Sequence, residues 1–500
     1  MIQRSRDLAF VTDEDGNISI NQGLICKCIQ QHIAEVDNRL KKLKMIYDNN
    51  QKIYTPSTEN KFYKGEKPLV NEAYDITTTL VGYICGEPVK YNYNDKSQYK
   101  TSLDKLIDHF DTTNESQHNT DLLTDMCIYG KAYELITFDD EDYDEGDNRP
   151  YLYILDPQST FVVYDTTVKK KPMFGVYYLP ITDKEGKLKK YNIMVYTESE
   201  ILTYETQNDS LNVESLTLIN REQHMFNGVP IIRYILNKNE FGAYERALGL
   251  IYALNDLMYN RITDKDNFVK QLLVLSDEDG NLPTDEQELK GLLELMKDSG
   301  IYIGKDAKFI NQVLDETQME VLSKSISNKI HKDCKVPDLT DEKFAGQSSG
   351  IALGFKMMGT EDIAVTIEAN IKAGIRKRLK LISNALKNTS DRFELKDITL
   401  IMVRCIPEFS SKQEKLQELQ ATWEKLSYET VLSRFDPEIN VKDEIERIKK
   451  MKEENSNIIS QSYNNYDFPK KDNKRVKEFE EGVNVDGRES SSREQQSRDE

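Results

Sequence analysis

Apolar residues recur at helical spacing in the first part of the chain. Over residues 21–48 they follow a period near 3.6, which predicts an amphipathic helix; the positions are Leu24, Ile25, Cys28, Ile29, Ile33, Val36, Leu40 and Leu43. The run NEAYDITTTLVGYIC predicts a second helix that stops at Gly86 and Pro88, with a short strand after it. Helical patterns at 97–110 and 117–129 complete this set.

The pattern then changes to short runs of β-branched and aromatic residues, which predict strands. The runs are KAYELITF, PYLYILDP, STFVVYDT, PMFGVYYLPI, KKYNIMVYT, EILTYET and VPIIRYIL. Turn signals such as DEDYDEGDN and DKEGK separate them. With the preceding helices, these strands predict an α+β body over residues 1–245.

Two helical patterns follow and bracket a small segment. Residues 244–273 carry one apolar stripe, and residues 317–335 carry another that ends before Pro337. Between them lie a strand pattern, LLVLSDEDGN, a helical pattern, and a second strand pattern, GIYIG. This order predicts a limb in which one helix leads out and the other returns.

A third long helix is predicted at 361–388, followed by a strand in DITLIMVRCIP and two helices near 410–426 and 441–454. We expect the apolar stripes of 246–272 and 361–388 to pack against neighbouring subunits, because these stripes are longer than the body of one subunit can cover. Residues 456–500 contain few large apolar side chains and are expected to be disordered.

Composition narrows the possible functions. The net charge of −19 argues against a protein that binds the phosphates of nucleic acid through clustered cations. It does not exclude a protein with an acidic surface along which DNA moves without binding. No apolar run approaches the ~20 residues of a membrane span, so we expect a soluble, intracellular protein without membrane contact. The six cysteines form no metal-site spacing, since only Cys26 and Cys28 are close, and we expect them to be reduced.

The segment GQSSG, at 346–350, matches the G-x-S-x-G nucleophile elbow of serine hydrolases. An elbow needs a buried strand before the serine, whereas KVPDLTDEKFA precedes Ser348 here. The histidine of an α/β-hydrolase follows the serine in the chain, whereas all five histidines of this chain precede it. A hydrolase is therefore disfavoured, and we expect no catalytic residue, cofactor or metal. The glycines and serines instead predict a mobile polar loop between two helices.

The order of these elements resembles the portal proteins of tailed bacteriophages, in particular the SPP1-type family of siphovirus-like phages. The likeness covers about residues 20–454, and four segments carry it: VPDLTDEKFAGQSSGIALGFKMMG, LVGYICGEPVKY, LYILDPQSTFVVYD and YALNDLMYNRITDKDNFVKQLLVL. The resemblance implies a multi-domain portal fold. Its parts would be a wing at 1–245, stem helices at 246–272 and 317–336, a clip at 273–316, a tunnel loop at 337–350, a wing helix at 351–390 and a crown at 391–455.

The family likeness also implies function and partners. The chain would form a ring, usually a dodecamer, at one capsid vertex, through which double-stranded DNA is packaged and ejected without sequence specificity. The terminase large subunit would dock on the clip during packaging, and a head-completion adaptor would dock there afterwards as part of the head–tail connector. Scaffolding and major capsid proteins would be further partners. The alternative is another phage structural protein, such as a minor capsid or adaptor component.

The resemblance implies DNA-facing residues in the loop, and the helical pattern of 246–272 gives candidates for an exposed face of the stem. In the loop these are Asp341, Glu342, Lys343, Gln347 and Ser348, with Gly346 and Gly350 as hinges. On the stem, the candidates for an exposed face are Asn255, Arg261, Asp264, Lys265 and Asn267, for which an ordinary solvated surface is the competing interpretation. The stretch KAGIRKRLKLI, at 372–382, is either a DNA-facing basic band or a solvent-exposed helix face whose cations pair with acidic neighbours.

Overall fold

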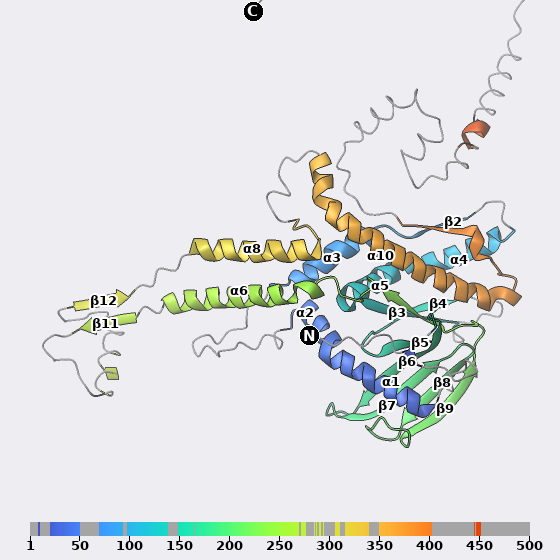
Figure 1. Cartoon of the computed structure of the whole chain (residues 1–500), viewed down its shortest axis with the longest axis horizontal. Coiled ribbons are helices and arrows are strands. Elements are labelled where there is room, and N and C mark those ends of the chain that lie inside the picture. Colours follow the sequence, from blue (N-terminus) through green and yellow to red (C-terminus); the bar gives the residue numbers. More distant parts are fainter. Residues whose placement is uncertain are drawn as a thin grey trace, which may run out of the picture. The chain divides into compact units, whose positions relative to one another are not determined.

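The computed structural model describes residues 9–10, 21–50, 70–93, 98–138, 149–165, 167–269, 272–276, 306–310, 316–339, 350–402 and 447–451, with the single positions 285, 287, 290, 291, 294 and 445. The chain divides into two units, Met1–Ser411 and Lys412–Glu500. The second unit is described only at helical positions within 445–451, so the fold described below is that of the first unit (Figure 1).

The N-terminal helices follow the predicted pattern. Helix α1 (Gln22–Glu35), a π-helical turn (Val36–Leu40) and α2 (Lys41–Tyr47) run on without a break. Asn21 begins α1, because its side chain accepts a hydrogen bond from the Leu24 amide at 2.8 Å. Next come α3 (Glu72–Cys85), which ends before Gly86 as predicted, α4 (Lys100–Thr112) and α5 (Glu115–Tyr129).

The strands form four sheets in the described residues. The largest has the order β1-β5-β6-β7-β8-β9 and is antiparallel except for β1 and β5, and a second has the order β10-β3-β4. The strands are β1 (Ala9–Phe10), β3 (Lys131–Thr137), β4 (Tyr151–Leu155), β5 (Thr160–Asp165), β6 (Pro172–Thr182), β7 (Leu188–Tyr196), β8 (Glu200–Thr206), β9 (Leu216–Gln223) and β10 (Ile231–Ile235). Strand β9 was not predicted, since only Leu216 of its side chains is buried and no alternation marks it.

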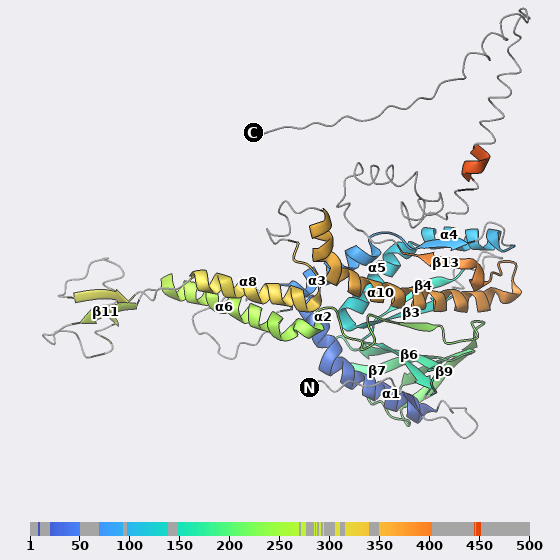
Figure 2. The same cartoon turned by 45° about the horizontal axis from the view of Figure 1, so that its top comes forward.

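Alternation along β5 shows how the large sheet is covered. Phe161 and Val163 pack with Ile25 and Ile29 of α1 on one face. Val162 and Tyr164, which point the other way, pack with residues of β3 and β10. The large sheet therefore lies between α1 and the smaller sheet, and both views show this arrangement (Figure 2). The mixture of helices and mainly antiparallel sheets is consistent with the predicted α+β class.

The two bracketing helices are present. A 3-10 turn (Glu245–Ala247) leads into α6 (Leu248–Val269), and α8 (Glu316–Cys334) returns. Between them in sequence, β11 (Leu272–Ser276) pairs antiparallel with β12 (Asp306–Ile310). The returning strand was predicted in GIYIG, which lies outside the described residues; β12 falls on DAKFI instead. The helix predicted between these strands is described only at four helical positions.

Helix α10 (Gly350–Ala385) is longer than predicted, because it begins before residue 361. After it, β13 (Ile398–Ile401) pairs with β2 (Lys90–Tyr93). The α10 stripe is at most 2% exposed at Ile367, Ile371, Ile375, Leu379 and Ile382. It packs within the chain, on the core that includes β10. The expectation that this stripe packs against neighbouring subunits is therefore wrong.

The same correction applies to the start of α6, where Ile251 and Leu254 are buried in their own chain.

Gly374 allows α10 to approach β10 closely, since a Cβ there would lie 2.0 Å from the Tyr234 ring. A glycine inside a helix otherwise costs about 1 kcal/mol relative to alanine. Its place in α10 is explained by this contact.

The buried cation Arg378 fixes α10 to the body. The side chain is fully buried, so its expected place on a DNA-facing band or a wet face is wrong. Its guanidinium donates to both carboxylate oxygens of Glu134 on β3, at 3.0 and 2.6 Å, and to Glu115 on α5. A further bond of 2.9 Å reaches the side-chain oxygen of Asn119. Tyr234 on β10 donates to Glu134 at 2.8 Å.

Electrostatics in this cluster keep Glu134 ionised. Burial alone would raise its pKa, but the charge of Arg378 and the hydrogen bond from His118 lower the pKa to about 2. The buried guanidinium is therefore matched by opposite charge and by hydrogen bonds, which a buried ion pair requires. Removal of one partner would leave an unpaired charge inside the body.

We predict that Arg378→Met lowers the free energy of unfolding of the body by about 3–5 kcal/mol, because two carboxylates would be left in a buried site without their cation. Arg376→Met, on the exposed face of the same helix, is the matched control and should change it by at most about 0.5 kcal/mol. Denaturant unfolding monitored by far-ultraviolet circular dichroism and tyrosine fluorescence measures both. Equal effects of the two substitutions would contradict the assigned role of Arg378.

Candidate functional site

The helix pair α6 and α8 and its junction with the body form the candidate site. The two helices lie side by side in both views (Figure 1; Figure 2), and Ser323 Oγ on α8 lies 3.8 Å from the Met258 sulfur on α6. The half-buried residues Met258 and Ile326 pack against the main core. The seam between the helices is therefore apolar near the body.

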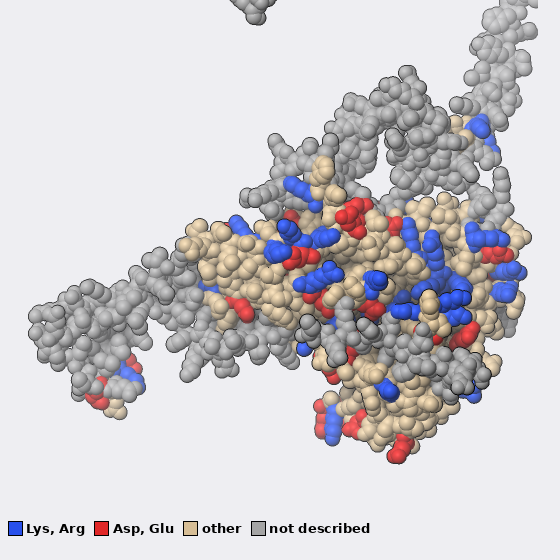
Figure 3. Space-filling model, viewed as in Figure 1, with Lys and Arg blue, Asp and Glu red and all other residues tan. Residues whose placement is uncertain are grey.

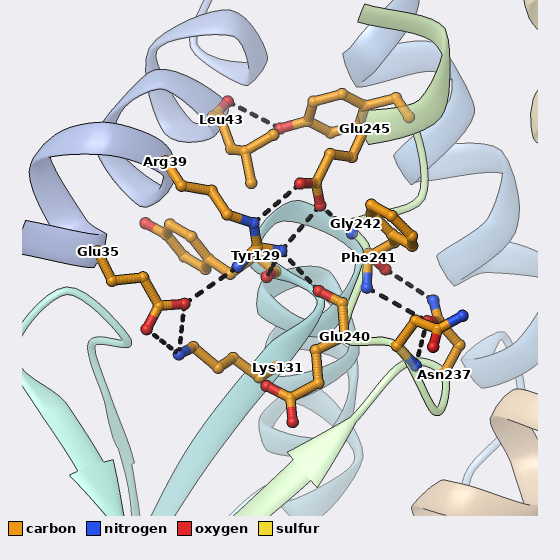
Figure 4. Close-up of polar contacts among 12 residues, drawn as sticks. Glu35, Arg39, Leu43, Tyr129, Lys131, Asn237, Glu240, Phe241, Gly242 and Glu245 are labelled. Carbon is orange, nitrogen blue, oxygen red and sulfur yellow. Dashed lines mark hydrogen bonds and ion pairs between the residues drawn. The ribbon is translucent and has the colours of Figure 1, made fainter. Parts of the chain in front are cut away.

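The start of α6 is held by Arg39, which the π-helical turn after α1 carries (Figure 4). Its guanidinium makes two bonds to the Glu245 carboxylate, at 2.9 and 2.8 Å. It also donates to the backbone oxygens of Tyr129 and Glu240, at 3.0 and 2.6 Å. One side chain thus ties together the N-terminal helices, the α5–β3 corner and the segment that leads into α6.

Glu35 extends this cluster toward the sheet. It accepts from Arg39 at 3.3 Å and from the Lys131 ammonium at 3.0 and 3.1 Å. Burial raises the pKa of Glu35, but the charge and hydrogen bond of Lys131 outweigh it, so the pKa is lowered. Tyr244 adds a bond of 2.8 Å from its hydroxyl to the Leu43 backbone oxygen.

Asn255 has a structural role, which corrects the prediction that it belongs to an exposed stem face. Its side chain is 2% exposed. Its oxygen accepts from the Val70 amide at 2.7 Å, and its nitrogen donates to the Ile251 backbone oxygen at 3.0 Å. Asn255 therefore fastens the segment before α3 to α6.

The end of α8 is held by His331. Its Nε2 lies 3.1 Å from the Glu72 carboxylate on α3, and its Nδ1 lies 3.1 Å from the Val336 backbone oxygen. Both partners can only accept, so both ring nitrogens donate and the imidazole is cationic. Ser327 also donates to Glu72, at 2.9 Å. After α8, the Lys335 backbone oxygen accepts from Thr360 of α10 at 2.8 Å.

Of the other predicted stem residues, Arg261 is half-buried, and its charge lowers the pKa of Glu320 on α8 after the larger effect of Lys324. Asp264, Lys265 and Asn267 lie on α6, with side chains outside the described part. The predicted loop residues Asp341, Glu342, Lys343, Gly346, Gln347 and Ser348 also lie outside it, while Gly350 is the first residue of α10.

The structure adds residues that the sequence did not single out. Arg39, Glu72, Glu245 and His331 hold the helix pair, and they come from segments far apart in the chain. A sequence signal existed for Arg39, because it lies between Val36 and Leu40 on the apolar side of the predicted helix. No local pattern pointed to Glu72 as the partner of His331.

The described histidines have structural partners. His32 lies against the Tyr178 hydroxyl, His109 against the Pro150 backbone oxygen, His118 against Glu134 and His224 against the Thr197 backbone oxygen. No cluster of three His, Cys, Asp or Glu side chains suited to a metal occurs in the described residues. The five cysteines in this part of the chain are free and buried, as expected for reduced structural cysteines. No described helix is long and apolar enough to cross a membrane.

The described fold is a body of mixed sheets and helices to which a helix pair is tethered. Residues 26–457 match the family described as phage portal protein, SPP1 Gp6-like, and the chain belongs to that family. This confirms the resemblance drawn from the sequence, and a family of structural proteins supports the expectation that the chain is not an enzyme.

No curated protein sequence matches the chain. Among solved structures, one similar chain belongs to "Neck of empty GTA particle computed with C6 symmetry", with 9% identity and a TM-score of 0.40. The match covers 73% of this chain and 90% of that chain.

We predict that the anchorage of α8 weakens as pH rises. Burial lowers the pKa of His331, but the hydrogen bond and charge of Glu72 outweigh it, so the pKa is raised above 6.5. The stability that the protonated ring adds is complete below 6.5 and is lost as the pH rises through the folded-state pKa. Hydrogen exchange of α8, corrected for intrinsic rates, should accelerate over this range.

His331→Gln should flatten this pH dependence, because the glutamine carries no titrating charge. His224→Gln is the matched control, since the pKa of His224 is lowered by burial and its ring contacts the Thr197 backbone oxygen instead. Exchange of α8 with the same pH profile in the wild type and in His331→Gln would exclude the proposed pairing.

Proposed function

We propose that the chain assembles into the ring, with a dodecamer as the expected form, through which double-stranded viral DNA enters and leaves one capsid vertex. The observation that carries this proposal is the portal-family match over residues 26–457. In this ring, α6 and α8 would form the channel wall. Their polar anchorage at Arg39 and His331 would hold the wall to the body of each subunit.

Exposed apolar side chains support assembly with further copies. On α8, Val321 is 64% and Leu322 is 47% exposed, and on the first half of α10, Phe355 is 73% and Met358 is 58% exposed. Large apolar side chains left exposed on a helix are typical of an interaction surface when they occur together. Neighbouring subunits of the ring are the proposed cover.

The finer parts follow the family likeness. Residues 1–245 with 351–390 would form the wing, and 391–455 the crown inside the capsid. The clip, 273–316, would dock the terminase large subunit and afterwards a head-completion adaptor. Scaffolding and major capsid proteins would contact the ring during assembly in the host cytoplasm, and the ring would remain in the virion.

The loop at 337–350 would face the DNA. The two segments that it joins are both anchored, through His331 and Val336 on one side and through Thr360 and Lys335 on the other. Motion would therefore be confined to the loop, with Gly346 and Gly350 as hinges. Asp341 and Glu342 would discourage phosphates from adhering, while Lys343, Gln347 and Ser348 would complete the polar surface.

The second candidate is another phage structural protein, such as a minor capsid or adaptor component, which would also have surfaces for partners. A serine hydrolase stays disfavoured. Its nucleophile, Ser348, lies outside the described residues, and each described histidine has a structural contact elsewhere.

We predict that Val321→Asp with Leu322→Asp reduces ring assembly, because two charges would enter the proposed subunit interface. Light scattering should show the wild type as a large oligomer and the variant shifted toward the 57.9 kDa subunit. Ser325→Asp with Asn328→Asp is the control, since it adds the same charge at exposed polar positions of α8. A wild type that stays monomeric at micromolar concentration would refute the ring.

We also predict that Asp341→Lys with Glu342→Lys slows DNA packaging in a salt-dependent way, because new phosphate contacts form and weaken as salt rises. Packaging rates of single capsids at two salt concentrations measure the effect. Lys184→Glu with Lys187→Glu, a charge change of equal size and opposite sign on the β6–β7 turn, should leave the rate unchanged. Unchanged rates in the loop variant at both salts would mean that this loop does not meet DNA.

A further inference from the structure

The second half of α10 presents a basic surface, although the chain as a whole is strongly acidic. Arg376, Lys377 and Lys380 are exposed and lie on the side of α10 away from the buried stripe, and Lys387 is exposed on the 3-10 turn (Leu386–Asn388) that follows the helix. We call these four residues the α10 band. Figure 3 shows Lys and Arg side chains gathered over this part of the body.

The carboxylates around the band are paired with other cations. Glu368 pairs with Lys372 at 2.5 Å, one turn before Arg376. Beyond the helix, Asp391 pairs with Lys105 at 3.1 Å, and Glu394 pairs with Lys396 at 2.6 Å. Among the described residues, no carboxylate forms an ion pair with a member of the band. The competing expectation was a solvent-exposed face whose cations pair with acidic neighbours. Lys372 has such a partner, whereas within the described ranges the residues of the band do not.

The two arginines next to the band are themselves paired with carboxylates. Arg233 on β10 lies close enough to Lys377 that its charge, after the larger effect of desolvation, lowers the pKa of that lysine. Arg233 is itself paired with Glu240 at 3.1 Å and stacks over the Tyr164 ring. Beneath the band, Arg378 is neutralised by Glu115 and Glu134. Four exposed cations thus remain without a carboxylate partner in the described part of the chain.

We propose that the α10 band binds the phosphate backbone of double-stranded DNA. Arg376 and Lys380 are one helical turn apart, about 6 Å along the axis, whereas DNA offers one negative charge per ~1.7 Å of its axis. Several phosphates are therefore within reach of the band. Contacts of this kind carry no sequence information, which suits a protein that handles a whole genome.

The band itself rests on the geometry of α10, whereas the choice of DNA as the polyanion rests on the proposed function. The band also differs in kind from the loop at 337–350, because acidic loop residues are expected to keep DNA moving, while exposed cations hold it. A portal subunit would then carry a DNA-holding surface on the body as well as a passage that does not hold DNA.

The test is the salt dependence of DNA binding by the purified full chain. A short mixed-sequence duplex is titrated into the wild type and into the variant Arg376→Ala, Lys377→Ala, Lys380→Ala. If three phosphate contacts are lost, the slope of log affinity against log salt should fall by about 2.7. The control variant Lys184→Ala, Lys187→Ala, Lys189→Ala removes the same charge from exposed positions of the β6–β7 turn and the start of β7, and it should keep the wild-type slope.

An equal slope in the wild type and in the α10 variant would overturn the proposal.

The proposal would also be overturned if the band binds an acidic segment of its own chain. Residues 139–148, which follow Phe138, contain seven carboxylates. Phe138 stacks on Phe226, whose backbone oxygen accepts from Asn384 of α10 at 3.1 Å. If DNA binds only after these carboxylates are changed to amides, the chain's own acidic segment is the ligand of the band. Light scattering on the same samples tests the ring separately, since a monomer that binds DNA through the band would refute only the proposed function.

Discussion

The arrangement of the body depends on one constraint, the burial of Arg378 without contact to water. A guanidinium removed from solvent must be matched in charge and in hydrogen bonds, and here Glu115 and Glu134 provide both. These carboxylates come from α5 and β3, so the match fixes α10 across two elements at once. The close contact of Gly374 with Tyr234 sets the distance between α10 and β10.

The position of α10 determines where the helix pair can attach. Thr360 of α10 bonds the backbone just after α8, and His331 bonds α8 to α3. On the other side of the pair, Arg39 holds the entry to α6. Polar groups that are largely buried thus fix both helices near the body, while Val321 and Leu322 stay exposed on α8. The proposed channel wall, shared between subunits, would require this combination of fixed attachment and an uncovered apolar surface.

Much of the fold could be predicted from the sequence, because apolar periodicity reports local structure directly. The helices from α1 to α8 and most strands of the body were predicted, whereas β9 was missed because its side chains are mainly exposed. The site was predicted less well. Asn255 and Arg378 are polar residues in phase with apolar stripes, so their phase indicated burial, but their residue types suggested exposure. Their partners lie far away in the chain, as Glu134 does from Arg378, and no local pattern encodes such pairs.

The central claim is that copies of this chain close into a ring with a central passage. Negative-stain electron microscopy of the purified full-length protein tests it most directly. Class averages should show a closed ring of identical subunits around an opening wide enough for a DNA duplex. Particles without an opening, or particles of single-subunit size, would contradict it.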